Sequence, residues 1–251
     1  SRSNPHGGRL LKKKMHALKS QERKWDNSKR TEQPDLEEAI CFFFDEVYVP
    51  KTKTILNLNI PKLTVNEKIL SQNIILEIIG NSHVGILGKN GVGKSTLLKE
   101  IKKQLEKRED IKVGYMPQNY EDTLPYDAYV LDYLVPSKKQ EEITKARTYL
   151  GNMKFTKEEM TGKIKTLSNG TKAKLFLVKF AIDKCNCLLL DEPTRNVSPL
   201  SNPVIRNVLK NFQGTIISIS HDRKYIKEVC NSVYLLTPNG LKRPTEKEFF
   251  L

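Results

Sequence analysis

The stretch Gly88-Lys89-Asn90-Gly91-Val92-Gly93-Lys94-Ser95-Thr96 follows an apolar run at 84–87 and opens a segment, 97–105, with apolar residues at helical spacing. The order of buried strand, glycine-rich loop and helix is the context of a phosphate-binding loop. Glycines let successive backbone N–H groups point at one anion, and the helix N-terminus adds partial positive charge. We predict that Lys94 reaches the β- and γ-phosphates of a nucleotide and that the Ser95 hydroxyl binds Mg²⁺. The expected phosphate-binding residues are Gly88, Asn90, Gly91, Gly93, Lys94, Ser95 and Thr96.

The 251 residues can bury one good core, or one core with an appendage. No run approaches 18 consecutive apolar residues and no signal peptide opens the chain, so we expect a cytoplasmic protein without a membrane span. Cys185 and Cys187 lack zinc or redox spacing, which favours ordinary buried thiols in a reducing compartment.

Positive charge is concentrated at the N-terminal end. Residues 1–30 hold ten Lys/Arg against two acidic residues, so they carry +8 of the net +14 and leave +6 for the other 221. Such a basic arm on a milder body favours contact with a polyanion. A solvated lysine-rich helix without a partner is an alternative that the sequence supports equally well.

The sequence Thr-Glu-Gln-Pro-Asp at 31–35 interrupts the basic segment, and we interpret it as a domain boundary. Residues 9–31 lack proline and glycine and predict an exposed helix with one apolar stripe. Strands are predicted at 40–44, 55–60 and 69–79, separated by Pro50, Pro61 and Asn66. Consecutive strands without helices indicate an antiparallel sheet ahead of the phosphate loop.

After the loop helix, the pattern predicts a strand at 111–116 and a small helical insertion at about 124–170. Within the insertion, 138–149 favours a helix and 156–159 resembles a helix start. The later core pattern predicts a buried helix around 175–182 and strands at 187–190, 215–220 and 233–236, the last being the final strand of the sheet.

Two carboxylates end the strand at 187–190. Asp191 is placed to hold Mg²⁺, directly or through water, and Glu192 can orient or deprotonate the water that attacks a γ-phosphate. Taken alone, an apolar strand ending in Asp-Glu is common, and a purely structural role for the two carboxylates is then as plausible as a catalytic one.

Three further side chains fit the same chemistry. Gln118 follows a strand and Pro117, and could reach both the metal and the attacking water. His221 ends the strand at 216–220, where an imidazole could contact the γ-phosphate. Ser168 stands where a helix N-cap belongs; its hydroxyl is either only a cap or a phosphate ligand assisted by the helix dipole.

The order of these elements resembles that of ABC-type ATPase domains over about residues 39–240. It runs from the phosphate loop through Gln118, Leu-Ser-x-Gly at 167–170 and Asp-Glu-Pro-Thr at 191–194 to His221. The resemblance implies an α/β P-loop NTPase of ABC ATPase type, with a mixed core sheet flanked by helices, an antiparallel β subdomain and a small α-helical subdomain. It also implies ATP and Mg²⁺ as cofactors, Ser95, Gln118 and Asp191 at the metal, Glu192, His221 and Gln118 in catalysis, and Ser168 and Gly170 as nucleotide ligands.

Ser-His-Asp-Arg at 220–223 is similar to the switch region of the ABC-F branch, whose soluble members act on ribosomes. Those proteins join two ATPase domains by a long basic helical linker. Residues 1–35 resemble the end of that linker, with 36–251 as the second ATPase domain. The run 191–200 is similar to that of Gram-positive antibiotic-resistance members that protect the ribosome.

The sequence departs from the family pattern in three places. Asn169 and Thr171 replace the usual glycine and glutamine or glutamate of the signature, and Ser198 replaces an aspartate. No aromatic residue lies at 64–67, where the adenine-stacking side chain is expected. Base selectivity should therefore be loose, with Val65 or the more distant Tyr48 as substitutes.

The resemblance implies an ATPase that is weak as a single domain and needs a second one, in the same parent chain or in a self-dimer. Ribosomal RNA is the expected partner of the basic segment. Two alternatives remain open: the nucleotide-binding subunit of a membrane ABC transporter, and a non-catalytic module for which nucleotide is only a structural ligand.

Overall fold

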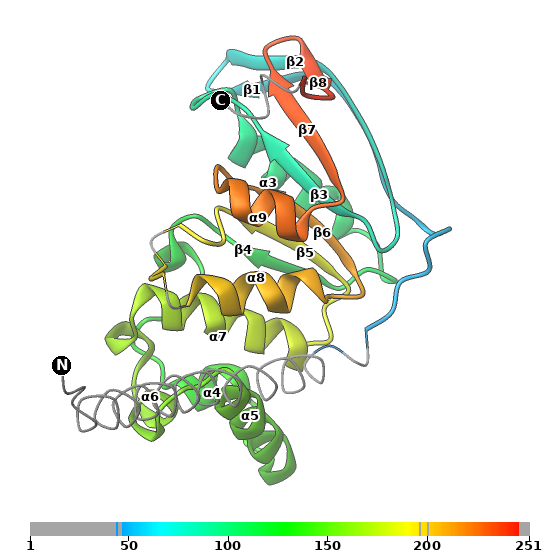
Figure 1. The fold of residues 1–251 in the computed structure, drawn as a ribbon. Helices are drawn as coiled ribbons and strands as arrows, with labels where there is room; N and C mark the ends of the chain where they lie inside the picture. Colours follow the sequence, from blue (N-terminus) through cyan, green and yellow to red (C-terminus); the bar gives the residue numbers. More distant parts are fainter. Residues whose placement is uncertain (1–43, 45–46, 196, 200, 246–251) are drawn as a thin grey trace, which may run out of the picture. The chain divides into compact units, whose positions relative to one another are not determined.

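A six-stranded sheet forms the centre of the fold (Figure 1). The computed structural model describes residue 44 and residues 47–195, 197–199 and 201–245. The strand order is β4-β5-β6-β3-β7-β8; all neighbouring pairs are parallel except β7–β8, so the sheet is mixed, as predicted. The strands are β3 (His83–Leu87), β4 (Val113–Met116), β5 (Cys187–Asp191), β6 (Thr215–Ile219), β7 (Ser232–Thr237) and β8 (Gly240–Lys242).

The central strands are buried on both faces, which explains their continuous apolar sequences. All five residues of β5 and of β6 are buried. In β3, Val84 and Ile86 belong to the core cluster that includes helix α3 (Lys94–Leu105). Gly85 points the other way, towards α9 (Arg223–Val229): a Cβ there would lie 2.8 Å from Ile226 Cδ1.

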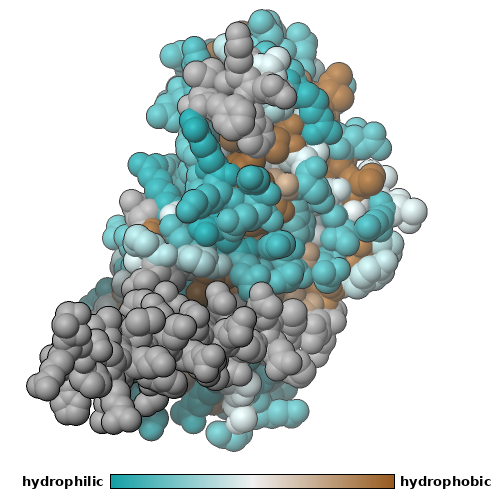
Figure 2. Space-filling model, in the orientation of Figure 1, coloured by the Kyte–Doolittle hydropathy of each residue, from teal (hydrophilic) through white to brown (hydrophobic). Residues whose placement is uncertain are grey.

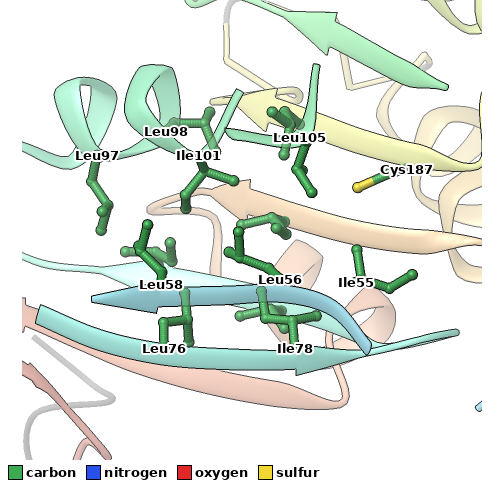
Figure 3. Packing of buried hydrophobic residues seen from close by; sticks show 14 of the residues in the cluster. Ile55, Leu56, Leu58, Leu76, Ile78, Leu97, Leu98, Ile101, Leu105 and Cys187 are labelled. Atoms are coloured by element: carbon green, nitrogen blue, oxygen red, sulfur yellow. The ribbon is translucent and has the colours of Figure 1, made fainter. Parts of the chain in front are cut away.

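Helix α3 packs between the central sheet and an antiparallel hairpin of β1 (Thr54–Val65) and β2 (Lys68–Ile79) (Figure 3). Figure 3 shows leucines and isoleucines of the hairpin and of α3 facing one another. The expected antiparallel sheet is present, but Pro61 does not separate strands. It lies inside β1, where its missing N–H is tolerated because this sheet has two strands and the other edge of β1 is unpaired within it.

Helices fill the stretch between β4 and β5. They are α4 (Val130–Leu134), α5 (Gln140–Asn152), α6 (Lys157–Thr161) and α7 (Asn169–Ile182), with short 3-10 turns at Tyr120–Asp122 and Ile164–Thr166. The predicted start at 156 is a capping box: Thr156 Oγ1 accepts the Glu159 N–H at 3.2 Å, and the Glu159 carboxylate accepts the Thr156 N–H at 2.9 Å. The boundaries 124 and 170 for a helical subdomain remain a prediction.

Two helices and one strand were not predicted. Helix α8 (Asn202–Lys210) precedes β6, and α9 precedes β7. Strand β8 follows β7 and pairs with it, so the expectation that 233–236 forms the last strand was wrong. Gly240, with φ 116°, lies at the turn that reverses the chain between them.

The N-terminal expectations fall outside the described residues. These are the helix at 9–31, the linker at 1–35 and residues 40–43 of the first predicted strand. No helix in the described part is long and apolar enough to cross a membrane. Figure 2 shows a face on which hydrophilic residues predominate and hydrophobic ones form separate small groups. Burial raises the pKa of the Cys185 and Cys187 thiols to about 12, which makes both inert.

Candidate functional site

Most of the predicted site residues meet at one edge of the sheet. Strands β4, β5, β6 and β3 are consecutive parallel neighbours, so their carboxyl ends face the same way. Asp191 is the last residue of β5, and Gln118, His221 and the phosphate loop follow the other three strands. Together they line one cleft of about 1070 Å³. The other lining residues are Val65, Asn66, Lys68, Leu70, Glu192, Thr194, Arg195, Ile219 and Asp222, together with Asn90, Gly91 and residues 93–96 of the loop.

The phosphate loop approaches the hairpin at Gly93, the residue before α3. Gly93 has φ 101°, in the left-handed region that favours glycine. A Cβ on this residue would lie 3.0 Å from Leu63 Cδ2 and 3.1 Å from Leu70 Cβ. The loop turn and its contact with the hairpin therefore both require glycine here. Gly88 lies at the other end of the loop and lines the neighbouring groove instead of the cleft.

Lys94 is 9% exposed and curls back over the loop. Its Nζ donates to Gly88 O at 2.7 Å and to Lys89 O at 3.0 Å. Burial lowers the pKa of Lys94, and the nearby carboxylates of Glu192 and Asp191 act in the opposite direction. The ammonium group therefore lies at the loop among acceptors that anionic phosphate oxygens could replace.

Ser95 and Asp191 join the loop helix to β5. Asp191 is 3% exposed, and burial raises its pKa, whereas a hydrogen bond from the Ser95 hydroxyl and the charge of Lys94 lower it. Hydroxyl and carboxylate oxygens are ligands that Mg²⁺ accepts, and a buried carboxylate gains from an added cation. The two residues therefore fit a Mg²⁺ ion. Gln118, exposed on the same cleft, could add an amide oxygen.

Glu192 lies beside Asp191 in an unusual backbone conformation. Its φ of 55° is in the left-handed region, and its N–H donates to Ile219 O at 2.9 Å. The carboxylate is 10% exposed; Oε2 accepts the His221 N–H at 3.2 Å, and Oε1 lies 3.5 Å from His221 Nε2. Burial raises the pKa of Glu192, and the His221 N–H opposes this rise.

A hydrogen bond that sequence reasoning missed ties the end of β5 to the start of α9. Thr194 Oγ1 donates to Asp222 Oδ2 at 3.0 Å. Asp222 Oδ1 accepts the N–H groups of Lys224 and Tyr225, which caps α9. The positions of Glu192 and His221 are thereby fixed relative to each other. Thr194 lies in the predicted run, but nothing in its sequence context names Asp222 as its partner.

Ser168 and Gly170 do not line the cleft. Ser168 caps α7 by accepting the Thr171 N–H at 3.1 Å and is exposed, whereas Gly170 is buried. A Cβ on Gly170 would lie 3.2 Å from Ser201 Oγ, so the start of α7 is packed closely against the chain before α8. Ser198, the departure from the family pattern, is exposed there, and its Oγ lies 3.3 Å from Ser201 Oγ.

The hairpin contributes both apolar and polar groups to the cleft. Val65 lines it as expected, and Asn66, Lys68 and Leu70 were not anticipated. Tyr48 is 71% exposed and is not among the lining residues. Among the described lining residues the only aromatic ring is that of His221.

Comparison with known proteins agrees with this architecture. Residues 71–195 match the family model described as ABC transporter. The chain is 32% identical over 177 residues to the probable ATP-binding protein YheS of Escherichia coli K12, covering 68% of this chain and 28% of YheS. It is 33% identical over 185 residues to ABC transporter F family member 2 of Arabidopsis thaliana, covering 70% of this chain and 27% of that protein. The chain thus spans less than a third of the length of these relatives.

Solved structures show the same fold at lower identity. The dimeric structure of MJ0796, a bacterial ABC transporter cassette, superposes with a TM-score of 0.62 at 19% identity, covering 76% of this chain and 96% of that one. A nucleotide-free ATP-binding cassette gives the same TM-score at 18% identity. With the family match, its ABC-F relatives and this fold together, the chain belongs to the ABC family of ATPases, whose domains bind and hydrolyse ATP.

Proposed function

We propose that this chain is an ATPase domain of a cytoplasmic ABC-F protein that acts on the ribosome. The observation that carries the catalytic part is the pairing of two largely buried carboxylates, Asp191 and Glu192, with Lys94 and Ser95 across one cleft. Phosphate-binding groups, metal-binding groups and a candidate base line the same cleft. This is the arrangement that ATP hydrolysis needs.

In this proposal the loop N–H groups and Lys94 bind the β- and γ-phosphates, which neutralises charge that builds up in the transition state. Ser95 and Asp191, with Gln118, would hold Mg²⁺; when bound, the ion neutralises phosphate oxygens. Glu192 accepts a proton from the attacking water, and its raised pKa makes it a stronger base than an ordinary glutamate. His221, beside Glu192, contacts the γ-phosphate.

A second ATPase domain, in the parent chain or in a second copy, completes the site. Ser168 and Gly170 lie outside the cleft of their own domain, so we propose that they contact the nucleotide held by the partner. ATP then closes the two domains on each other because it binds the closed state more tightly, and hydrolysis reopens them. Alone, the chain should bind ATP and hydrolyse it slowly.

The ribosomal part rests on the ABC-F relatives and on the basic residues 1–30. These residues would contact RNA phosphates and add affinity with little sequence readout. Antibiotic resistance by ribosome protection is the narrowest form of the proposal, and it rests on the run 191–200 alone. The competing function is a nucleotide-binding subunit of a membrane transporter, for which the basic segment has no evident use.

Co-sedimentation with bacterial ribosomes tests the proposal. The complete protein carries Glu192→Gln, with the matching change in its second ATPase domain, so that bound ATP persists. We expect ATP-dependent and not ADP-dependent pelleting, weakening steeply as salt rises. Pelleting with membranes and not with ribosomes would instead support the transporter subunit. A resistance assay in cells then tests the drug-related part.

A further inference from the structure

The Ser168 hydroxyl stands at the end of a chain of hydrogen bonds. Ser168 Oγ accepts the Thr171 N–H at 3.1 Å and lies 2.8 Å from Thr171 Oγ1. Thr171 Oγ1 donates to Glu159 Oε1 at 3.2 Å. The other carboxylate oxygen of Glu159 accepts the Thr156 N–H in the capping box of α6. This series of hydrogen bonds therefore connects the N-terminus of α6 to that of α7.

The direction of the protons along this chain follows from counting donors. A glutamate carboxylate only accepts, so the single Thr171 hydroxyl proton points to Glu159. The 2.8 Å contact between the two hydroxyls then needs the Ser168 proton, which must point inward at Thr171. Ser168 consequently turns oxygen lone pairs, and no proton, towards solvent.

A phosphate oxygen needs a donor, so this arrangement opposes phosphate binding by Ser168. We propose that Glu159, acting through Thr171, is a positioning residue that turns the Ser168 proton away from the nucleotide of the partner domain and so weakens ATP-dependent closure. Closure must first rotate the Ser168 hydroxyl and break its bond to Thr171. The domain pair then reopens more readily after hydrolysis. This inference rests on the proposed contact between Ser168 and the partner's nucleotide.

Glu159→Gln should reverse the donor–acceptor direction of these hydrogen bonds without removing the helix cap. The amide oxygen of glutamine can accept the Thr156 N–H, and its NH₂ group can donate to Thr171 Oγ1. The Thr171 hydroxyl then donates to Ser168, whose own proton is free for a phosphate oxygen. A purely structural role for Glu159 would predict equal or weaker closure on substitution, whereas this inference predicts tighter closure.

The test measures ATP occlusion in the complete protein carrying Glu192→Gln and the matching change in its second ATPase domain. Occluded ATP is the amount retained through gel filtration, titrated against ATP concentration. Adding Glu159→Gln should lower the half-saturating ATP concentration about tenfold, the effect of one hydrogen bond to a charged group. Thr171→Val, which removes the inward acceptor, should act in the same direction.

Glu158→Gln is the matched control. It removes a neighbouring, exposed negative charge of α6 and has no role in the hydrogen-bond chain. It should leave the half-saturating concentration unchanged. In a Ser168→Ala background, Glu159→Gln should lose its effect, because there is no hydroxyl left to reorient.

The outcomes separate this inference from the proposed function. Occlusion that is equal in the Glu159→Gln and Glu158→Gln variants, or that is weakened by Glu159→Gln, would overturn the inference alone. A gain that persists without the Ser168 hydroxyl would also overturn it. If the parent variant occludes no ATP at any concentration, the proposed closure of two domains is itself wrong.

Discussion

Glu192 has a left-handed backbone conformation and a largely buried carboxylate, both of which lower the stability of the fold. The hydrogen bond from the His221 N–H holds this carboxylate in place. Such features collect at functional sites because the surrounding fold holds them in place. At neutral pH the ionised side chain opposes folding, since burial favours its protonated form.

Glu192→Gln should therefore lower ATP turnover by about 10²–10⁴-fold, the typical contribution of a general base, and leave ATP binding intact. Steady-state phosphate release and equilibrium ATP binding measure the two effects in the complete protein. Unchanged turnover would support the module in which nucleotide is only a structural ligand.

The same substitution should raise the free energy of unfolding of the nucleotide-free chain by about 1 kcal/mol at pH 7. The raised pKa of Glu192 means that the unfolded carboxyl is the stronger acid, so wild-type stability falls as pH rises from the unfolded pKa through the folded one. Glutamine removes this loss. Urea unfolding measures it, and exposed Glu109→Gln is the control that should show no gain.

Turnover should also depend on pH through Glu192. The base works only when ionised, and burial raises its pKa, so kcat/KM should fall on acidification at a higher pH than an ordinary glutamate would give. A pH–rate profile at limiting ATP measures this. An activity that stays flat down to the usual range of a glutamate would assign the base elsewhere.

The glycine-rich loop between a strand and a helix could be predicted from sequence because it consists of consecutive residues with a fixed local geometry. The bond between Thr194 and Asp222 could not, because it joins residues 28 positions apart through the arrangement of β5 and β6. The roles of Gln118, Glu192 and His221 remain predictions, although the fold does bring all three to one cleft.

At the scale of elements, the end of α3 is tied to the start of β1 by Arg108. Its Nη1 donates to Thr54 O and Ile55 O, both at 2.8 Å, and its Nε and Nη2 donate to the two carboxylate oxygens of Asp110. One guanidinium group thereby connects the loop helix to the hairpin that covers it.

Arg108→Met should lower the free energy of unfolding by about 1–2 kcal/mol, because two backbone carbonyls lose a charged donor. Methionine keeps most of the aliphatic stem, so the loss reports on the polar contacts. Chemical denaturation measures it, with exposed Lys107→Met as the control. A cost equal to that of the control would show that water replaces the guanidinium at no net loss.

Elements were predicted well where periodicity is local and poorly where tertiary context decides. The strands β5 and β6 and the helix α7 were evident from apolar runs and helical spacing. Pro61 was misread as a strand end because the sequence does not reveal that its strand has an unpaired edge. The helices α8 and α9 were missed because, with nine and seven residues, they are shorter than the window of about 11–18 residues over which helical spacing of apolar residues is distinctive.

At the scale of the whole molecule, Ser168 lies outside its own cleft, and the proposed contact with a partner's nucleotide would make activity depend on a second domain. For the chain on its own, specific ATPase activity should therefore increase with protein concentration as self-dimers form. Phosphate release measured over a wide concentration range checks this. A specific activity independent of concentration would mean that one domain suffices or that copies do not pair.

The strand order also bears on synthesis of the protein. The strand that leads into the phosphate loop, β3, is flanked by β6 and β7, which are made more than 120 residues later. A ribosome translating this chain exposes the glycine-rich loop long before either flanking strand exists. We therefore expect the loop to reach its folded geometry only late in synthesis, so a product interrupted before β6 should not bind ATP.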